Sequence, residues 1–146
     1  MKYPIGIQDF EKIIEDGYVY VDKTELVYKL ANEGHIYFLS RPRRFGKSLL
    51  ISTLKYYFQG RKDLFRGLAI DKLETKWAEY PVFHLSFGSA NFTKHGTLDE
   101  VIDNYLADFE NDYPTNTKPR DFGIRFASIL KAAHKMTGRR AVVLID

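Results

Sequence analysis

The stretch HIYFLSRPRRFGKSLL, residues 35–50, decides the fold. It joins an apolar run to a basic loop and to the beginning of a helical pattern. Its GKS, residues 46–48, fills the last three places of the phosphate-binding pattern GxxxxGK[ST]. Such a loop needs a strand before it and, after it, a helix whose N-terminus faces the anion. The apolar run at 35–40 predicts a buried strand, and the apolar spacing at 48–58 predicts the helix.

Three residues of this loop have separate expected roles. Gly46 would let the backbone approach the phosphates, and Lys47 would reach the terminal phosphates as a point charge. The hydroxyl of Ser48 would ligate Mg²⁺. Arg41 departs from the pattern, because it stands where the first glycine is expected. A side chain at that place restricts the turn if its φ must be positive.

The loop is strongly basic, with Arg41, Arg43, Arg44 and Lys47 inside seven residues. These cations could hold nucleotide phosphates or a nucleic-acid backbone. Alternatively, the arginines lie in solvent and pair with acids such as those of the acidic stretch at 98–112. The sequence assigns nucleotide binding to the whole loop: Arg41, Pro42, Arg43, Arg44, Phe45, Gly46, Lys47 and Ser48.

The run AVVLID, residues 141–146, predicts a strand that is buried on both faces, as in a parallel sheet. An aspartate after four apolar residues is typical of a Walker B element, whose carboxylate holds Mg²⁺ through water. Ser48 and Asp146 are therefore the expected metal ligands. The alternative for Asp146 is that it caps the next turn. Because chains seldom stop at the tip of a central strand, we expect the sequence to be the N-terminal piece of a longer protein.

The remaining pattern alternates helices with strands, which favours an α/β fold with a mainly parallel sheet. Periodicity predicts helices at 9–16, 22–30, 48–58, 98–110 and 122–135, and strands at 35–40, 82–87 and 141–146. Asp22 and Glu25 have the spacing of a capping box at the start of the second helix.

Composition excludes several classes of protein. The chain has 146 residues, a formal net charge of +3, 45% hydrophobic residues and no cysteine. The hydrophobic content excludes a disordered chain, and the missing cysteines exclude disulfide frameworks, thiolate zinc sites and cysteine nucleophiles. No apolar run is long enough to span a membrane. The sequence predicts a cytoplasmic protein with no membrane partner.

Four further motifs accompany RPRRFGKSLL: PIGIQDFEKI at 4–13, YVDKT at 20–24, LFRGL at 64–68 and YPVFHLSF at 80–87. Together they resemble the bacterial predicted AAA-ATPase-like family. The resemblance implies a three-layer P-loop NTPase domain of the additional-strand class, incomplete at its C-terminus. Residues 1–146 would form the N-terminal part of this domain, with a helical and extended segment to about residue 34. The phosphate-loop strand through the Walker B strand would occupy 35–146.

The resemblance also implies a function. It implies ATP binding and Mg²⁺-dependent hydrolysis by the full-length protein, driving an attached nuclease-like domain through which nucleic acid is contacted. The water-activating acid would lie just past Asp146, so no catalytic residue is assigned within the chain. Arg41 in place of glycine is typical of the family. The DKT element, residues 22–24, lies near the nucleotide or caps a helix.

In the additional-strand class, another strand separates the strand at 35–40 from the strand at 141–146. That strand would come after residue 146, so we expect both strands to expose unpaired edges and the fragment to be poorly stable or to self-associate. Two other functions remain open: a nucleotide or nucleic-acid binding module with little turnover, and a small-molecule phosphotransferase.

Overall fold

The computed structural model describes residues 1–88, 90–116 and 121–146. The chain forms two compact units, Met1–Glu79 and Tyr80–Asp146. The first unit contains the phosphate-loop motif and the second contains the Walker B motif. That the two units are parts of one domain stays a prediction.

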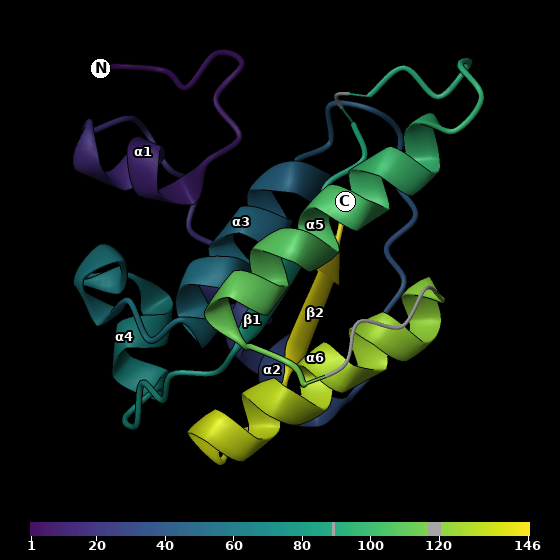
Figure 1. Ribbon diagram of the computed structural model, residues 1–146. Coiled ribbons are helices and arrows are strands. Elements are labelled where there is room, and N and C mark those ends of the chain that lie inside the picture. The colour runs from purple at the N-terminus through teal and green to yellow at the C-terminus, as the bar shows by residue number, and fades with distance from the viewer. Residues whose placement is uncertain (89, 117–120) are drawn as a thin grey trace. The chain divides into compact units, whose positions relative to one another are not determined.

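Among its described residues, the regular elements of the first unit are all helices. Its elements are α1 (Phe10–Glu15), α2 (Thr24–Glu33), α3 (Lys47–Phe58), the 3₁₀ helix η1 (Lys62–Phe65) and α4 (Ala69–Leu73) (Figure 1). Each presents apolar side chains to one core, whose buried members are Phe10, Val27, Tyr56, Tyr57, Leu64, Phe65 and Ile70. The core is rich in aromatic rings, which bury more area per residue than aliphatic side chains.

Helix α3 contacts both α1 and α2 in the first unit. Helix α1 packs on it, and the backbone N–H of Phe10 donates to the Ser52 hydroxyl at 2.9 Å in a buried position. Ser52 in turn donates to Asp9, the N-cap residue of α1. Tyr56 donates to Glu11 at 3.1 Å. These bonds fix the direction of α3 and therefore the place at which the phosphate loop enters it.

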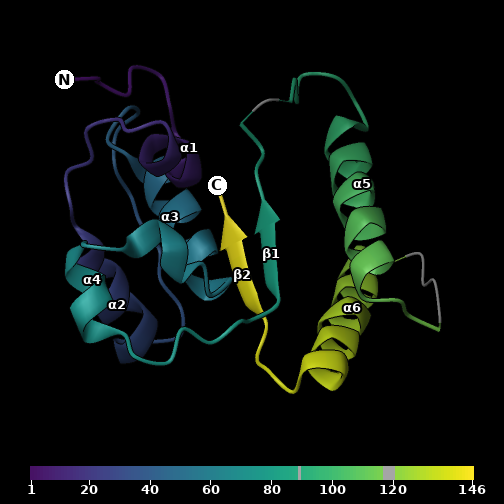
Figure 2. The ribbon, with the colours of Figure 1, turned by 90° about the vertical axis from the view of Figure 1, so that its left-hand side faces the viewer.

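The second unit is a two-stranded parallel sheet, with β1 (Val82–Leu85) paired to β2 (Val142–Ile145). The register opposes Phe83 to Val143 and Leu85 to Ile145. Two helices connect the strands, α5 (Thr97–Asp112) and α6 (Phe122–Thr137), and both cover the same face of the sheet (Figure 2). This arrangement confirms an α/β chain whose described strands are parallel.

The helices of the second unit are held by aromatic and ionic contacts. Phe83 of β1 is fully buried, and its ring lies 4.9 Å from that of Phe109 and 5.9 Å from that of Phe126. Arg125 of α6 is clamped by two carboxylates of α5, because it donates to both Glu110 and Asp103. The clamp joins α5 to α6 beside the hydrophobic core.

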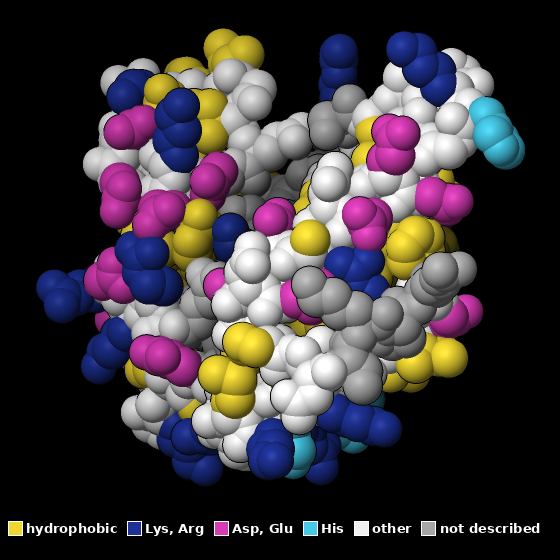
Figure 3. Space-filling view, in the orientation of Figure 1, with side chains coloured by type: hydrophobic (Ala, Val, Ile, Leu, Met, Phe, Trp, Pro, Cys, Tyr) yellow, Lys and Arg dark blue, Asp and Glu magenta, His cyan; other side chains and the backbone are white. Residues whose placement is uncertain are grey.

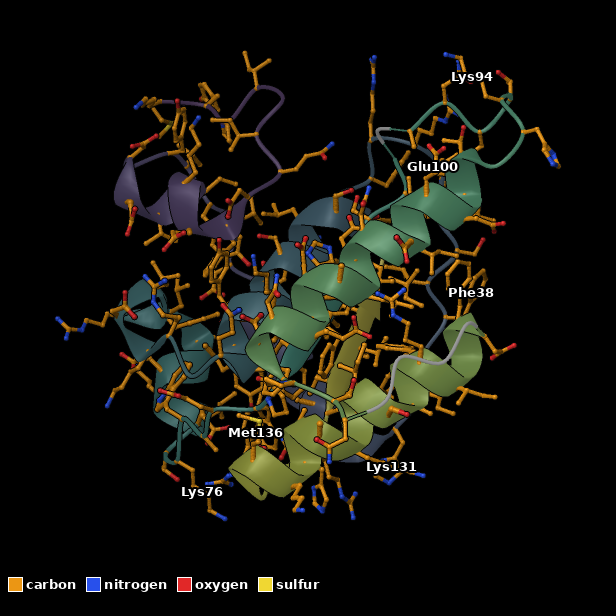
Figure 4. All side chains as sticks on the ribbon, viewed as in Figure 1. Phe38, Lys76, Lys94, Glu100, Lys131 and Met136 are labelled. Atoms are coloured by element: carbon orange, nitrogen blue, oxygen red, sulfur yellow. The ribbon has the colours of Figure 1, made fainter. Side chains whose placement is uncertain are left out.

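The prediction of a buried strand at 35–40 is wrong. These residues are extended but belong to neither helix nor strand, and Ile36 and Phe38 are 95% and 93% exposed. Figure 4 labels Phe38 on this stretch between α2 and α3. A strand exists only through pairing, and no described segment of the chain pairs with this one. The apolar pattern is that of a strand, but pairing is absent.

The prediction that 141–146 is buried on both faces is also wrong, although a strand does form there. Leu144 points to the core at 8% exposure, whereas Val143 and Ile145 are 39% and 62% exposed. The reason is that α5 and α6 both lie on one face of the sheet (Figure 2). Apolar composition alone does not report whether a second layer is present.

The predicted helices form within a few residues of the expected ends. The capping box that was predicted at the start of α2 does not form, because Glu25 forms an ion pair with Lys29 rather than bonding back to Asp22. Asp22 does accept the N–H of Thr24 at 2.9 Å. Over the described ranges, no helix combines the length and the apolar character needed to cross a membrane.

Candidate phosphate-binding site

The phosphate-loop motif turns sharply into α3. Gly46 is the N-cap residue of this helix and has a left-handed φ of 75°. Arg44 is also left-handed, with φ 67°, although it carries a side chain. A left-handed non-glycine residue is strained and persists only where its surroundings enforce it, which happens most often at functional sites. The two left-handed residues, Arg44 and Gly46, lie on either side of Phe45 and direct the chain into the helix.

Lys47 closes the loop from inside. Its Nζ donates to the backbone carbonyl oxygen of Arg41 at 2.6 Å. The ammonium group of Lys47, the seventh residue of the loop, therefore lies over Arg41, the first residue. A bound phosphate would compete for the same donor, and an ammonium group has three of them. That Lys47 meets a phosphate at this place stays a prediction.

The N-terminus of α3 is open. Gly46 has no side chain to cap the helix, and the first intrahelical bond runs from the N–H of Leu50 to the carbonyl oxygen of Gly46 at 3.0 Å. The amides of the first turn are the donors that an α-helix leaves unsatisfied, and the helix dipole adds positive potential there. Helix α3 has twelve residues, and its far half is buried in the core of the first unit. Rigid amides beside a fixed ammonium group suit an anion.

Arg41 does not occupy a position that requires glycine. Among the residues that the structure describes, the non-glycine residues with positive φ are Arg44 and Trp77. The strain expected from a side chain at the first place of the motif is therefore absent. At the other end of the loop, nothing lies within 4 Å of the position where Gly46 would carry a Cβ atom. Its glycine is needed for the backbone conformation.

The basic side chains of the loop are exposed. Arg41, Arg43 and Arg44 all lie on the surface, and Phe45 between them and the helix is 62% exposed. None of the three arginines forms an ion pair with a described carboxylate. The acids of 98–112 belong to the second unit, so the alternative that the arginines pair with them stays a prediction. Their guanidinium groups remain available to an anionic ligand.

Asp146 follows the last residue of β2 and extends its pairing. The N–H of Asp146 donates to the carbonyl oxygen of Leu85, and the N–H of Phe87 donates to that of Asp146, both at 2.9 Å. The backbone of this aspartate is thus fixed at the carboxyl end of the parallel pair. Asp146 is exposed to solvent. Ligands of parallel α/β sheets bind beyond this end of the strands.

The structure brings the eight loop residues together in the first unit, and Asp146 belongs to the second. Across the described ranges, no three His, Asp or Glu side chains converge as a metal site would require. A hydroxyl from Ser48 and a carboxylate from Asp146 are nonetheless oxygen donors of the kind that Mg²⁺ prefers. That these two residues together hold the ion stays a prediction.

The DKT element caps a helix, but not the one that follows it. The second carboxylate oxygen of Asp22 accepts the N–H of Ala69 at 2.7 Å, and Thr24 Oγ1 accepts the N–H of Ile70 at 3.1 Å. Asp22 also accepts the hydroxyl of Thr24 at 2.7 Å. Both side chains therefore satisfy the open N-terminus of α4. Thr24 is completely buried.

This arrangement perturbs the ionisation of Asp22. Burial by itself raises the pKa of the carboxyl group, but hydrogen bonds from the Thr24 side chain and from the amides of Thr24 and Ala69 outweigh it. The net result is a pKa below the usual value. Hydrogen bonds to the charged form account for this direction. Asp22 is thus held as a carboxylate for a structural purpose.

Sequence reasoning did not find two contacts that support the site. Ser52 holds α1 to the helix that begins at the phosphate loop. Tyr105 of α5 accepts the N–H of Ser86 at 3.0 Å and donates to its carbonyl oxygen at 2.9 Å, immediately after β1. Both contacts join residues far apart in the chain. A periodic pattern carries no signal of such pairs.

Comparison with known proteins supplies a family. The family model described as "Predicted AAA-ATPase" matches residues 4–146. A protein of Azotobacter chroococcum mcd 1, described as an uncharacterized protein in the vnfD 5' region, is 42% identical over 146 residues. The match covers 99% of this chain and 28% of that relative. No solved structure matches the chain significantly.

Proposed function

Because the chain belongs to the predicted AAA-ATPase family, we propose that residues 41–48 bind the phosphates of ATP for Mg²⁺-dependent hydrolysis. The observation that supports this most strongly is the closed loop, in which Lys47 reaches the carbonyl oxygen of Arg41 beside the uncapped start of α3. The ammonium group and the uncapped helix amides lie at the same end of α3, and the exposed guanidinium groups belong to the residues just before it. That combination suits several adjacent phosphate oxygens.

Each residue has a defined task in this proposal. The first-turn amides of α3 hold the phosphate chain, and Lys47 neutralises charge at its terminal phosphates. Arg43 and Arg44 are exposed cations that can approach the same oxygens. Ser48 and Asp146 would hold Mg²⁺, which supplies neutralisation of the charge shared between the last two phosphates. We further propose that the two units form one additional-strand P-loop domain.

The residues named so far bind and neutralise charge, but none of them activates water. Hydrolysis also requires a group that orients or deprotonates the attacking water. His84 lies within β1 between the buried residues Phe83 and Leu85, a position typical of packing. We therefore propose that the water-activating acid lies outside residues 1–146. The whole protein would use the hydrolysis to drive an attached domain.

Release of inorganic phosphate tests this proposal. It is measured on residues 1–146 and on a longer protein that contains them, each with saturating Mg·ATP. We expect background turnover from the shorter chain and hydrolysis by the longer one, which Asp146→Asn abolishes because one metal ligand is lost. Hydrolysis by residues 1–146 at the rate of the longer protein would place the catalytic group within them. Binding of Mg·ATP without turnover by either protein would instead favour a binding module.

A further inference from the structure

The second unit carries a basic surface that the phosphate site does not use. Between Phe122 and Ile145 the sequence has five Lys and Arg residues and no Asp or Glu. Arg125 is one of the five, and two carboxylates of α5 neutralise it. The other four lie with one histidine at the end of α6. This group is called the basic end here, and its members are Lys131, His134, Lys135, Arg139 and Arg140, all of them exposed.

Local geometry gathers these side chains. Lys131, His134 and Lys135 have the i, i+3, i+4 spacing that places residues on one face of a helix. The helix ends where Gly138 adopts a left-handed φ of 67° and donates its N–H to the carbonyl oxygen of His134 at 2.8 Å. His134 Nδ1 lies 2.8 Å from the carbonyl oxygen of Arg139. The chain thus turns back, and both arginines follow beside the last helical turn.

The charge of the basic end is not neutralised within the described chain. No carboxylate of the described residues forms an ion pair with Lys131, Lys135, Arg139 or Arg140. Figure 3 shows Lys and Arg side chains and a histidine gathered below α6, and Figure 4 labels Lys131 there. Compensation of the helix dipole accounts for cations in the last turn of a helix. It does not account for two arginines beyond the helix or for the absence of acids.

We propose that the basic end docks on the phosphate backbone of double-stranded nucleic acid. Duplex DNA carries one negative charge per about 1.7 Å of its axis, so several close cations can each meet a phosphate. The ring of Tyr80 lies 5.7 Å beneath Arg139 and is itself half-buried. Contacts to phosphates rather than stacking on unpaired bases therefore suit this surface, and binding is independent of sequence.

Fluorescence anisotropy with a labelled 20-base-pair DNA duplex tests the proposal, using the 146-residue chain without nucleotide. The first variant carries Lys131→Gln, Lys135→Gln, Arg139→Gln and Arg140→Gln. The matched control carries Lys12→Gln, Lys23→Gln, Lys62→Gln and Lys72→Gln, four exposed lysines of the first unit. Each variant loses four charges, so both change from +3 to −1. A third variant, Arg43→Gln with Arg44→Gln, reports binding through the phosphate loop.

The expected results follow from counterion release. Four phosphate contacts give a slope of about −3.6 in log affinity against log salt, or about a 150-fold loss from 50 to 200 mM salt. The first variant should bind at least tenfold more weakly at 50 mM salt and lose most of this slope. The control and third variants should stay within about threefold of the unchanged chain. Circular dichroism should show the same helix content in all four proteins.

Several results would overturn the proposal. One is that the unchanged chain does not bind the duplex at 50 mM salt. The others are that the first and control variants lose affinity equally, or that only the third variant loses affinity. Equal competition by polyglutamate at matched charge concentration would assign the basic end to an acidic protein. Tighter binding of a single strand than of the duplex would also contradict it.

Discussion

Gly46 and Arg44 give the loop at residues 41–48 its left-handed backbone turns. Both have a left-handed backbone, at φ 75° and φ 67°, and only one of them is glycine. Nothing in the described chain would contact a Cβ atom at Gly46 within 4 Å, so no protein contact requires a glycine there and the backbone conformation does. Arg44 has the same conformation with a full side chain, which costs about 1–2 kcal/mol. A guanidinium group at that place is thus held despite strain, as expected of a residue that meets a ligand.

The conformational role of Gly46 can be measured. Gly46→Ala should lower the free energy of unfolding by about 1–2 kcal/mol, because a Cβ atom is unfavourable at left-handed φ. Urea denaturation followed by tryptophan fluorescence gives the value. Gly88→Ala is the matched control, since that glycine also has open space around it but no positive φ. Equal effects of the two substitutions would mean that the left-handed turn is not formed in solution.

At the scale of elements, short helix α4 depends on α2. Asp22 and Thr24 supply the caps that the N-terminus of α4 lacks, and they do so across more than forty residues of sequence. The motif YVDKT is visible in the sequence, but its partner RGLAI at 66–70 could not be identified from periodicity. Capping was predicted correctly for Asp22, and the helix that it caps was not. Which helix a side chain caps is decided here by tertiary hydrogen bonds, and the local sequence pattern does not indicate them.

The ionisation of Asp22 should make stability depend on pH. Its folded pKa lies below the unfolded value, so its contribution is complete above the unfolded pKa, about 3.9. That contribution is lost as the pH falls through the lower, folded pKa. Asp22→Asn should therefore reduce stability at pH 7 and flatten the fall in stability between pH 5 and pH 3. Urea titrations at several pH values measure both effects.

Thr24→Val provides the companion test at the same cap. The valine keeps the shape of the threonine but leaves the buried N–H of Ile70 without its acceptor. An unsatisfied buried donor costs about 1–3 kcal/mol, and the same urea titration reports it.

For the Asp22 prediction, parallel curves of stability against pH for Asp22→Asn and the unchanged chain, from pH 7 to pH 3, would show that this carboxylate does not cap α4.

The secondary structure that the sequence predicted correctly is the part that depends on local pattern. Helices α1, α2, α3, α5 and α6 follow apolar periodicity and glycine stops, and their existence was predictable. Strands at 82–85 and 142–145 also form. The stretch at 35–40 has the same apolar character but no partner, since pairing depends on residues elsewhere. That residues 41–48 bind phosphate stays a prediction, which rests on their spacing.

At the scale of the molecule, apolar surface is left uncovered within each unit. In the first unit, Ile36, Tyr37, Phe38 and Leu39 are consecutive and range from 45% to 95% exposed. In the second unit, Val143 and Ile145 lie on the face of the sheet opposite the helices. Extended apolar segments without pairing partners are templates for association. We therefore propose that residues 1–146 self-associate through such segments.

Sedimentation velocity tests self-association. The unchanged chain should sediment as a concentration-dependent mixture, and Ile36→Lys with Phe38→Lys should shift it toward the monomer by adding charge to the extended stretch. Leu26→Lys with Leu98→Lys is the matched control, because both leucines are about half exposed on helices. A monomer at all concentrations with a sharp, reversible melting transition would contradict this expectation.

Isothermal titration calorimetry of Mg·ATP into the unchanged chain and into Lys47→Ala tests the central claim most directly. The ammonium group that lies over the carbonyl oxygen of Arg41 is the charge expected to meet the terminal phosphates. Its removal should weaken binding by about 2 kcal/mol, or roughly thirtyfold, as for a charge-assisted contact. Lys55→Ala, on the same helix two turns away, should bind as the unchanged chain does. Equal affinities for Lys47→Ala and the unchanged chain would contradict the assignment of residues 41–48 as a phosphate-binding loop.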